Sequence, residues 1–169
     1  MFAFAPLHAN TENFNETSTI LMIENPNPLH LSVVKGDIET VKKLNWSPDI
    51  IHVNGWLASL LPLYLKEFYK TEPLFTESKI VTSVYNQSFD GTLNKNMINK
   101  IKFDGLEDEA IETLSKPDYI NLMKVAIDNS DAIIRGSESL PSELDTYLNE
   151  LTKPVLDFHS IEEFADPYT

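Results

Sequence analysis

The fold of this chain is decided by residues 48–65, which read PDIIHVNGWLASLLPLYL. The apolar run from Ile50 to Val53 is typical of a strand buried on both faces of a parallel sheet. After a turn at Asn54-Gly55, apolar residues recur at the spacing of one helix face, with Pro62 predicting a kink or a late start: Leu57, Leu60, Leu61, Tyr64, Leu65 and Phe68. A strand, a tight turn and a helix form half of a βαβ unit, in which ligands bind at the turn. We therefore predict a binding site at His52–Trp56.

Strand and helix patterns alternate along the rest of the chain. Further strands are predicted over residues 79–85, 132–134 and 154–158, and helices over 38–44 (capped by Asp37), 106–114, 119–127 (capped by Asp118), 140–151 and a short capped turn at 160–163. This alternation predicts an α/β fold, a Rossmann-like parallel sheet with flanking helices. We divide the chain into residues 1–35, an irregular N-terminal arm with an edge strand at Thr19–Ile23, and residues 36–169, the α/β domain.

Composition excludes several classes of function. The 169 residues carry a net charge of −13, which argues against nucleic acid or an anionic membrane surface as a partner. No cysteine is present, so disulfides, thiolate metal sites and cysteine nucleophiles are excluded, which fits a cytoplasmic protein. The N-terminus lacks the basic residue and the long apolar core of a signal peptide, and no run reaches the length of a membrane span. His8, His30 and His159 have no metal-ligand spacing, and we expect neither a metal nor a cofactor.

Three loops resemble one enzyme family. Pro48–Leu65 resembles the glycogen and starch synthase segment Asp-Val-Val-His-x-His-Asp-Trp-His…Pro-x-Tyr-Leu. Thr82–Gly91 is similar to the family's Thr-Val-His-Asn-Leu-Ala-Tyr-Gln-Gly loop, and Lys124–Leu144 to its Lys-Ala-Gly…Ala-Asp…Val-Ser-Pro-x-Tyr-x-x-Glu-Ile segment. The match covers roughly residues 36–164 and looks closest to short, single-domain glycogen-synthase-like proteins of Bacteroidetes-type bacteria. The resemblance implies part of the N-terminal, acceptor-side domain of a GT-B glycosyltransferase. Such enzymes serve glycogen biosynthesis by passing glucose from a nucleotide sugar to an α-glucan.

Departures from the family pattern bear on activity. Where the family has an Asp and further His residues in the first loop, this chain has Gly55, Asn54 and Leu57, and Tyr85 replaces the family's active-site His. The family's Lys-Thr-Gly-Gly-Leu donor loop and its C-terminal domain have no counterpart here. Glucosyl transfer needs fixed polar groups aimed at the developing charges, so their loss indicates a pseudoenzyme rather than a working transferase. The residues that match the family are His52, Trp56, Asn86, Gly91, Lys124 and Ser137.

The loops after the first three predicted strands should meet at one edge of the sheet. Their polar and aromatic residues are our candidates for a substrate pocket: His52, Asn54, Trp56, Tyr85, Asn86, Ser137 and Glu138. Each has a structural alternative. His52 fits a core histidine equally well, Trp56 and Tyr85 fit packed aromatics, and Glu138 fits a solvated carboxylate. We identify no catalytic residue among them.

Three functions follow from these patterns. The first is a shortened family member that binds α-glucan or an oligosaccharide, or that docks on another protein of glycogen metabolism. A truncated sheet would leave an edge and an apolar face uncovered, which favours self-association or a partner. The second is a half-enzyme whose donor domain comes from a partner chain. The third is an ankyrin-type adaptor, suggested by residues 28–44, although one repeat cannot bury its own face and four predicted strands contradict it.

Overall fold

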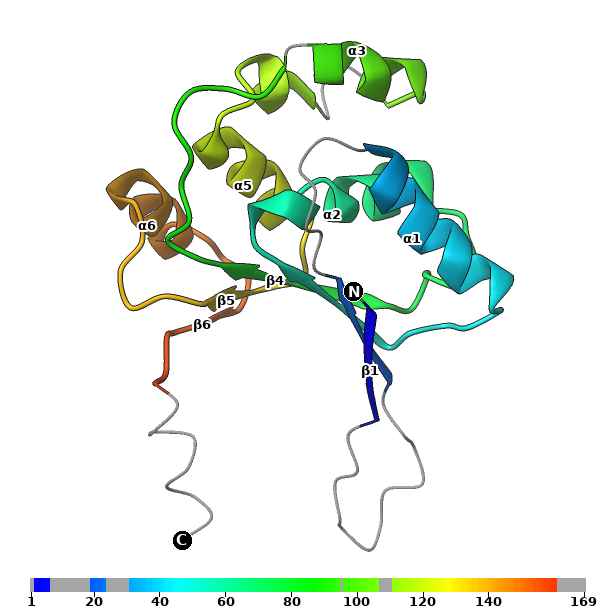
Figure 1. Ribbon diagram of the computed structural model, residues 1–169. Coiled ribbons are helices and arrows are strands. Elements are labelled where there is room, and N and C mark those ends of the chain that lie inside the picture. The colour runs from blue at the N-terminus through cyan, green and yellow to red at the C-terminus, as the bar shows by residue number, and fades with distance from the viewer. Residues whose placement is uncertain (1, 7–18, 24–30, 95, 107–110, 161–169) are drawn as a thin grey trace, which may run out of the picture.

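The computed structural model describes residues 2–6, 19–23, 31–94, 96–106 and 111–160. Its centre is a six-stranded sheet whose strand order follows the chain from one edge to the other. The strands are β1 (Phe2–Pro6), β2 (Thr19–Ile23), β3 (Ile50–Asn54), β4 (Lys79–Val84), β5 (Ala132–Arg135) and β6 (Val155–Leu156). β1 pairs antiparallel with β2, and β2 through β6 run parallel (Figure 1). The predicted α/β fold with a parallel sheet is confirmed.

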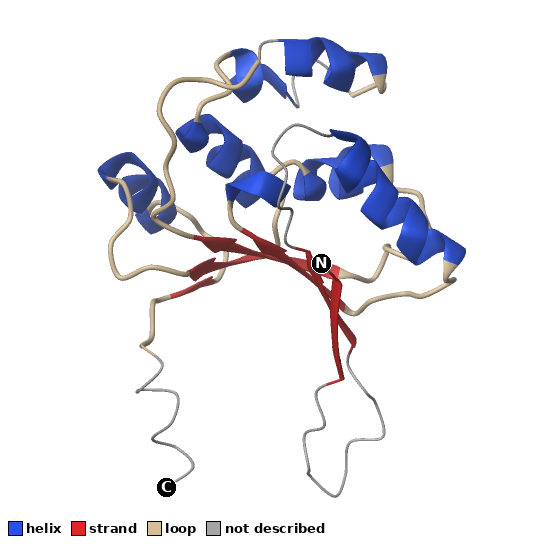
Figure 2. Cartoon of the chain, viewed as in Figure 1, coloured by secondary structure: helices blue, strands red, loops and turns tan. Residues whose placement is uncertain are grey.

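Helices connect successive parallel strands. They are α1 (Leu31–Lys43), η1 (Trp56–Ala58), α2 (Leu61–Leu63), η2 (Tyr64–Phe68), α3 (Asn96–Phe103), η3 (Glu112–Ser115), α5 (Tyr119–Asp128) and α6 (Ser142–Asn149). Right-handed crossovers between strands in sequential order must all pass over the same face. Figure 2 shows this result, with the described helices on one side of the sheet. We call this side the covered face and the other side the open face.

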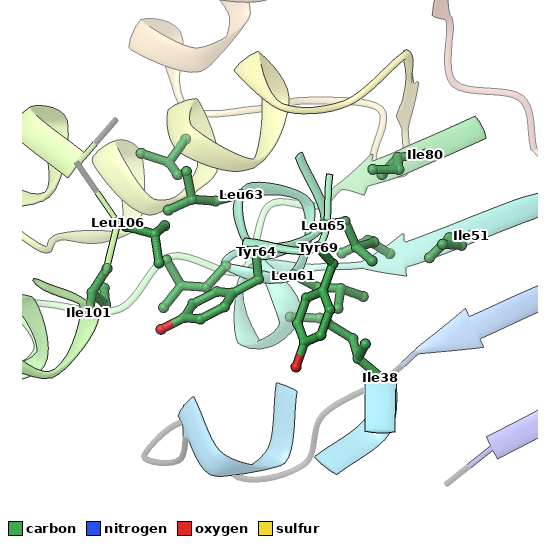
Figure 3. Close-up of a cluster of buried hydrophobic side chains, with 14 of the residues drawn as sticks. Ile38, Ile51, Leu61, Leu63, Tyr64, Leu65, Tyr69, Ile80, Ile101 and Leu106 are labelled. Carbon is green, nitrogen blue, oxygen red and sulfur yellow. The ribbon is translucent and has the colours of Figure 1, made fainter. Parts of the chain in front are cut away.

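The core lies between the covered face and the helices. Ile51 of β3 and Ile80 of β4 are paired in register and almost fully buried, and they meet side chains from α1, α2 and η2 (Figure 3). Two tyrosines place hydroxyl groups at this apolar cluster, and both hydroxyl groups are hydrogen-bonded to carboxylates. Tyr64 donates to Asp104 over 2.6 Å and Tyr69 donates to Glu39 over 3.0 Å. Burial raises the pKa of both phenols, that of Tyr69 to about 12, so both remain donors at neutral pH.

The structure corrects several local predictions. The strand at Ile50–Asn54 is buried on the covered face only, because its alternate residues are partly exposed on the open face. Residues 56–68 form three short helical segments, with Pro62 in the first turn of α2, as expected for a late start. Helix α1 begins at Leu31, so Asp37 does not cap it, and it crosses the predicted boundary at residue 35.

Other segments also differ from the predicted ones. Thr19–Ile23 is a strand, but it pairs on both sides, and β1 occupies the edge. Helix α3 was not predicted. Parts of two predicted helices, residues 107–110 and 161–163, lie outside the described residues. The sheet contradicts the ankyrin alternative, because residues 31–43 form one helix leading into a strand. Among the described helices, none has the length and apolar character needed to cross a membrane.

Candidate functional site

The site lies where β3, β4 and β5 end. The three strands are parallel and adjacent, so their carboxyl ends share one edge of the sheet. Two backbone hydrogen bonds join the loops to the neighbouring strand: Gly55 N–H donates to the Ser83 carbonyl over 3.1 Å, and Gly136 N–H donates to the Val84 carbonyl over 2.8 Å. Gly55 has a φ of +67°, a left-handed conformation that favours glycine. The predicted convergence of the three loops is therefore present.

Tyr85 occupies the middle of this edge. Its ring lies directly against Gly136, where an added Cβ would come within 2.4–2.8 Å of the ring carbons, so no side chain fits there. Its phenol donates to Asn54 Oδ1 over 3.0 Å. Its backbone carbonyl accepts a hydrogen bond from the hydroxyl of Tyr119, whose pKa is raised by burial. These contacts hold the Tyr85 ring in one orientation.

Asn54 contributes an unmatched donor. Its Oδ1 accepts from Tyr85, whereas its Nδ2 is buried and has no hydrogen-bond partner among the described residues. An unsatisfied buried donor costs about 1–3 kcal/mol. Beside it, the Asn86 N–H donates to Ser137 Oγ over 3.0 Å and ties the second loop to the third. Donors and acceptors from three strands are thus gathered around one aromatic ring.

The remaining candidate residues lie elsewhere. The Trp56 ring packs on Phe89 with centroids 4.5 Å apart and touches both parts of the core, which favours its structural alternative. His52 lies on the open face, two residues before Asn54 in β3, and its Nε2 is 2.8 Å from Ser83 Oγ. Glu138 is exposed, and no hydrogen bond or ion pair joins it to another described residue.

Two contributors were missed. Gly136 was predicted only as part of a loop, and Tyr119 was not singled out at all. A signal for Tyr119 was available, because the capping residue Asp118 fixes the start of α5, and a crossover helix antiparallel to the strands begins at their carboxyl edge. No comparable signal in the sequence marks the close approach of the Tyr85 ring to Gly136.

The electrostatics of the site favour a neutral ligand. Residues 52–56, 85–91 and 136–138 contain no Lys or Arg. The nearby Arg135 is held by three side chains: it pairs with Asp145, donates to Asn149 over 2.8 Å and lies 3.3 Å from Asp157. Its charge is therefore already balanced. Across the described part of the chain, no group of three His, Asp or Glu residues could hold a metal ion.

Comparison with known proteins gives a consistent result. The family model described as starch synthase catalytic domain matches residues 32–155. The glycogen synthase of Clostridium perfringens is 33% identical over 111 residues, covering 64% of this chain and 23% of that protein. The glycogen synthase of Chlorobaculum parvum is 36% identical over 113 residues, covering 64% of this chain and 22% of that protein.

A solved structure supports the fold. The catalytic domain of starch synthase IV from Arabidopsis thaliana, bound to ADP and acarbose, aligns with 74% of this chain at a TM-score of 0.58 and 19% identity. The aligned part is 28% of that domain, and the chain spans less than a quarter of the two glycogen synthases. Because the family model covers most of its length, this chain belongs to the glycogen and starch synthase family and corresponds to one part of the starch synthase catalytic domain.

Proposed function

We propose that this chain binds α-glucan or a shorter oligosaccharide at the carboxyl edge of β3–β5 and does not by itself transfer glucose. The observation that carries the proposal is the fixed Tyr85 ring, with Asn54 bonded to its phenol and the loop of Asn86 and Ser137 beside it. Sugar sites commonly combine an aromatic surface with a few oriented amide and hydroxyl groups. Asn86 is exposed and Tyr85 and Ser137 are half-buried, so a sugar can reach their polar groups.

The charge of the chain supports a neutral sugar over a nucleotide sugar. A diphosphate would meet a protein of net charge −13 at loops with no free cation. The side chains that the family resemblance assigns to the reaction are also changed here, to Gly55 and Tyr85. Neither a glycine nor a phenol can replace the carboxylate and imidazole that stabilise charge in the transition state. Binding without transfer is the function that fits these residues.

The test is a titration of the full chain with maltooligosaccharides and, separately, with ADP-glucose, followed by amide NMR shifts. We expect the glucan to shift residues 54–56, 85–87 and 136–137. Tyr85→Phe and Asn54→Ala should each weaken binding by about tenfold, the effect of about 1.4 kcal/mol. Tyr147→Phe is the matched control, because it removes a phenol that bonds Asp128 over 2.5 Å at the other end of α5. Glucan binding that is absent, or equal in all variants, would refute the proposal.

A second candidate is a half-enzyme, because the chain belongs to the same family as two relatives named glycogen synthase. In a half-enzyme, a donor-binding domain from another polypeptide would complete the active site. ADP-glucose shifts in the isolated chain, or glucosyl transfer only after a second protein is added, would support this half-enzyme. Glucan shifts with no effect of ADP-glucose would support the binding function alone.

A further inference from the structure

The loop that follows β4 is held by hydrogen bonds at three consecutive residues. The Tyr85 carbonyl accepts from the Tyr119 hydroxyl. The Asn86 N–H donates to Ser137 Oγ over 3.0 Å. The Gln87 N–H is hydrogen-bonded to the same Tyr119 hydroxyl, and this bond partly opposes the rise in the pKa of the phenol that burial causes. Because Tyr119 is a buried residue of α5, the core fixes the path of this loop.

The side chain of Gln87 lies close to Gly55 in the neighbouring loop. A Cβ built on Gly55 would be 3.5 Å from Gln87 Oε1 and 3.8 Å from Tyr85 Cδ2, so the carboxamide and the ring approach the same glycine. Gln87 is exposed, and within the described ranges of the chain its carboxamide has no hydrogen-bond partner. Its donors and its acceptor are therefore available to a ligand beside the Tyr85 ring.

A carboxamide at this position suits a neutral sugar. It offers one acceptor oxygen and two N–H donors, but no charge. Neighbouring hydroxyl groups of a sugar ring can each donate and accept, so one amide can accept from the first and donate to the second. A phosphate group offers mainly acceptors and would leave the amide oxygen unpaired. Since the backbone of Gln87 is already held, binding has to order only its side chain, which favours affinity.

We infer that Gln87 is a specificity-determining residue of the site and binds two neighbouring hydroxyl groups of the sugar that contacts Tyr85. This inference rests on the proposed glucan binding and adds one residue to it. The family segment Val-His-Asn-Leu corresponds to residues 84–87 of this chain, so the contact replaces a leucine and is particular to this sequence.

The first measurement detects the carboxamide directly in the natural chain. In a titration of the full chain with maltoheptaose, the side-chain NH2 resonances of Gln87 should shift with the same midpoint as the backbone amides of residues 85–86. The side-chain NH2 of Asn129 is the internal control, because it donates to the Val125 carbonyl over 2.9 Å at the other end of α5. Gln87 side-chain resonances that stay fixed while the backbone amides shift would overturn the inference.

The second measurement compares the affinity of variants for maltoheptaose. Gln87→Met keeps the length of the side chain but removes its polar groups, so it should weaken binding about threefold to tenfold, the effect of about one hydrogen bond. Gln87→Ala should weaken binding by a similar factor. Ser88→Ala is the matched control, because it removes a polar group from the next exposed residue of the same loop, and it should leave the affinity unchanged.

The outcomes separate this inference from the proposed function. Binding that is weakened by Tyr85→Phe but unchanged in Gln87→Met would keep the glucan site and overturn the role of Gln87. An equal loss in Ser88→Ala would overturn that role as well, because the whole loop rather than one side chain would then set the affinity. A natural chain that does not bind maltoheptaose would refute both.

Discussion

The two faces of the sheet are built from the same strands but have different surroundings. On the covered face, Ile51, Val53 and Ile133 are at most 1% exposed and pack under helices. On the open face, Ile50, Val81 and Ile134 alternate with them and remain partly exposed. The difference arises from topology, since strands in sequential order send every crossover over one face. Side chains of equal hydrophobicity therefore contribute unequally to stability on the two faces.

The sharpest test compares two adjacent isoleucines of β3. Ile51→Ala should lower the free energy of unfolding by about 2–5 kcal/mol, because it removes buried methyl groups and leaves a cavity. Ile50→Ala, one residue away on the open face, should cost about 1 kcal/mol, since partial exposure limits the area it buries. Urea denaturation followed by circular dichroism measures both. Equal losses would show that the two faces are covered equally well.

Replacing glycine by alanine should lower the free energy of unfolding at the sheet edge and raise it in the helical layer. Gly136→Ala would place a methyl group against the Tyr85 ring and should destabilise the fold by about 1–3 kcal/mol, displacing the ring from Asn54. Gly36→Ala has open space around it within α1 and should stabilise by about 0.5–1 kcal/mol. Thermal unfolding distinguishes them. A Gly136→Ala protein of unchanged stability would mean that Tyr85 is not fixed as described.

Asp131, at the amino end of β5, should make stability depend on acid pH. Burial disfavours its charged form, but hydrogen bonds from the Ile80 N–H (2.7 Å) and Lys66 (2.9 Å) outweigh burial and lower its pKa below the usual 3.8. A carboxyl group with a lowered pKa stabilises the fold above its unfolded pKa, and this contribution is lost as the pH falls through the folded pKa. Asp131→Asn should cost about 1–2 kcal/mol at pH 7.

The pH profile of this variant provides its control. As the pH falls below 3.8 and through the lowered folded pKa of Asp131, the stabilities of the natural chain and Asp131→Asn should converge, because the natural carboxyl group becomes protonated. Urea midpoints measured from pH 2 to 7 would reveal the convergence. A constant difference across this range would assign the loss to packing rather than to charge.

The smallest expected difference in stability loss is between substitutions of two adjacent hydroxyl residues of β4. Thr82, on the covered face, shares a 2.7 Å hydrogen bond with Ser130, and Ser83, on the open face, contacts His52 over 2.8 Å. Thr82→Val should cost about 1 kcal/mol, because Ser130 keeps only its bond to the Ala126 carbonyl. Ser83→Ala should cost less, because its partner His52 is only half-buried and water can replace the lost hydrogen bond to the imidazole. Chemical denaturation measures both losses. A larger loss for Ser83→Ala than for Thr82→Val would contradict the assignment of the two faces.

The sequence was most informative where one local pattern decides the structure. Three strands were predicted from short apolar runs bounded by polar turns, and Asp118 was predicted as the cap of α5, where it accepts from the Asn121 N–H. The clustering of Asn54, Tyr85, Asn86 and Ser137 followed from the rule that parallel strands end at one edge. Whether these residues bind a sugar stays a prediction.

Other features depend on tertiary contacts that a single sequence does not reveal. Residues 57–68 have a helical apolar pattern, yet they fold as three short segments. The direction in which His52 points could have been predicted from its alternation with Ile51 and Val53, but the exposure of that face depends on the path of every crossover. The contact of Tyr85 with Gly136 joins residues 51 positions apart, beyond the reach of local patterns.

The sequential strand order also gives the sheet a direction of growth. During synthesis the N-terminal strands emerge first, and each later strand finds its neighbour already in place. No strand has to insert between two others, so every pairing step closes a loop no longer than one crossover. The sheet can therefore assemble strand by strand during translation, and β6, the last and shortest strand, completes it.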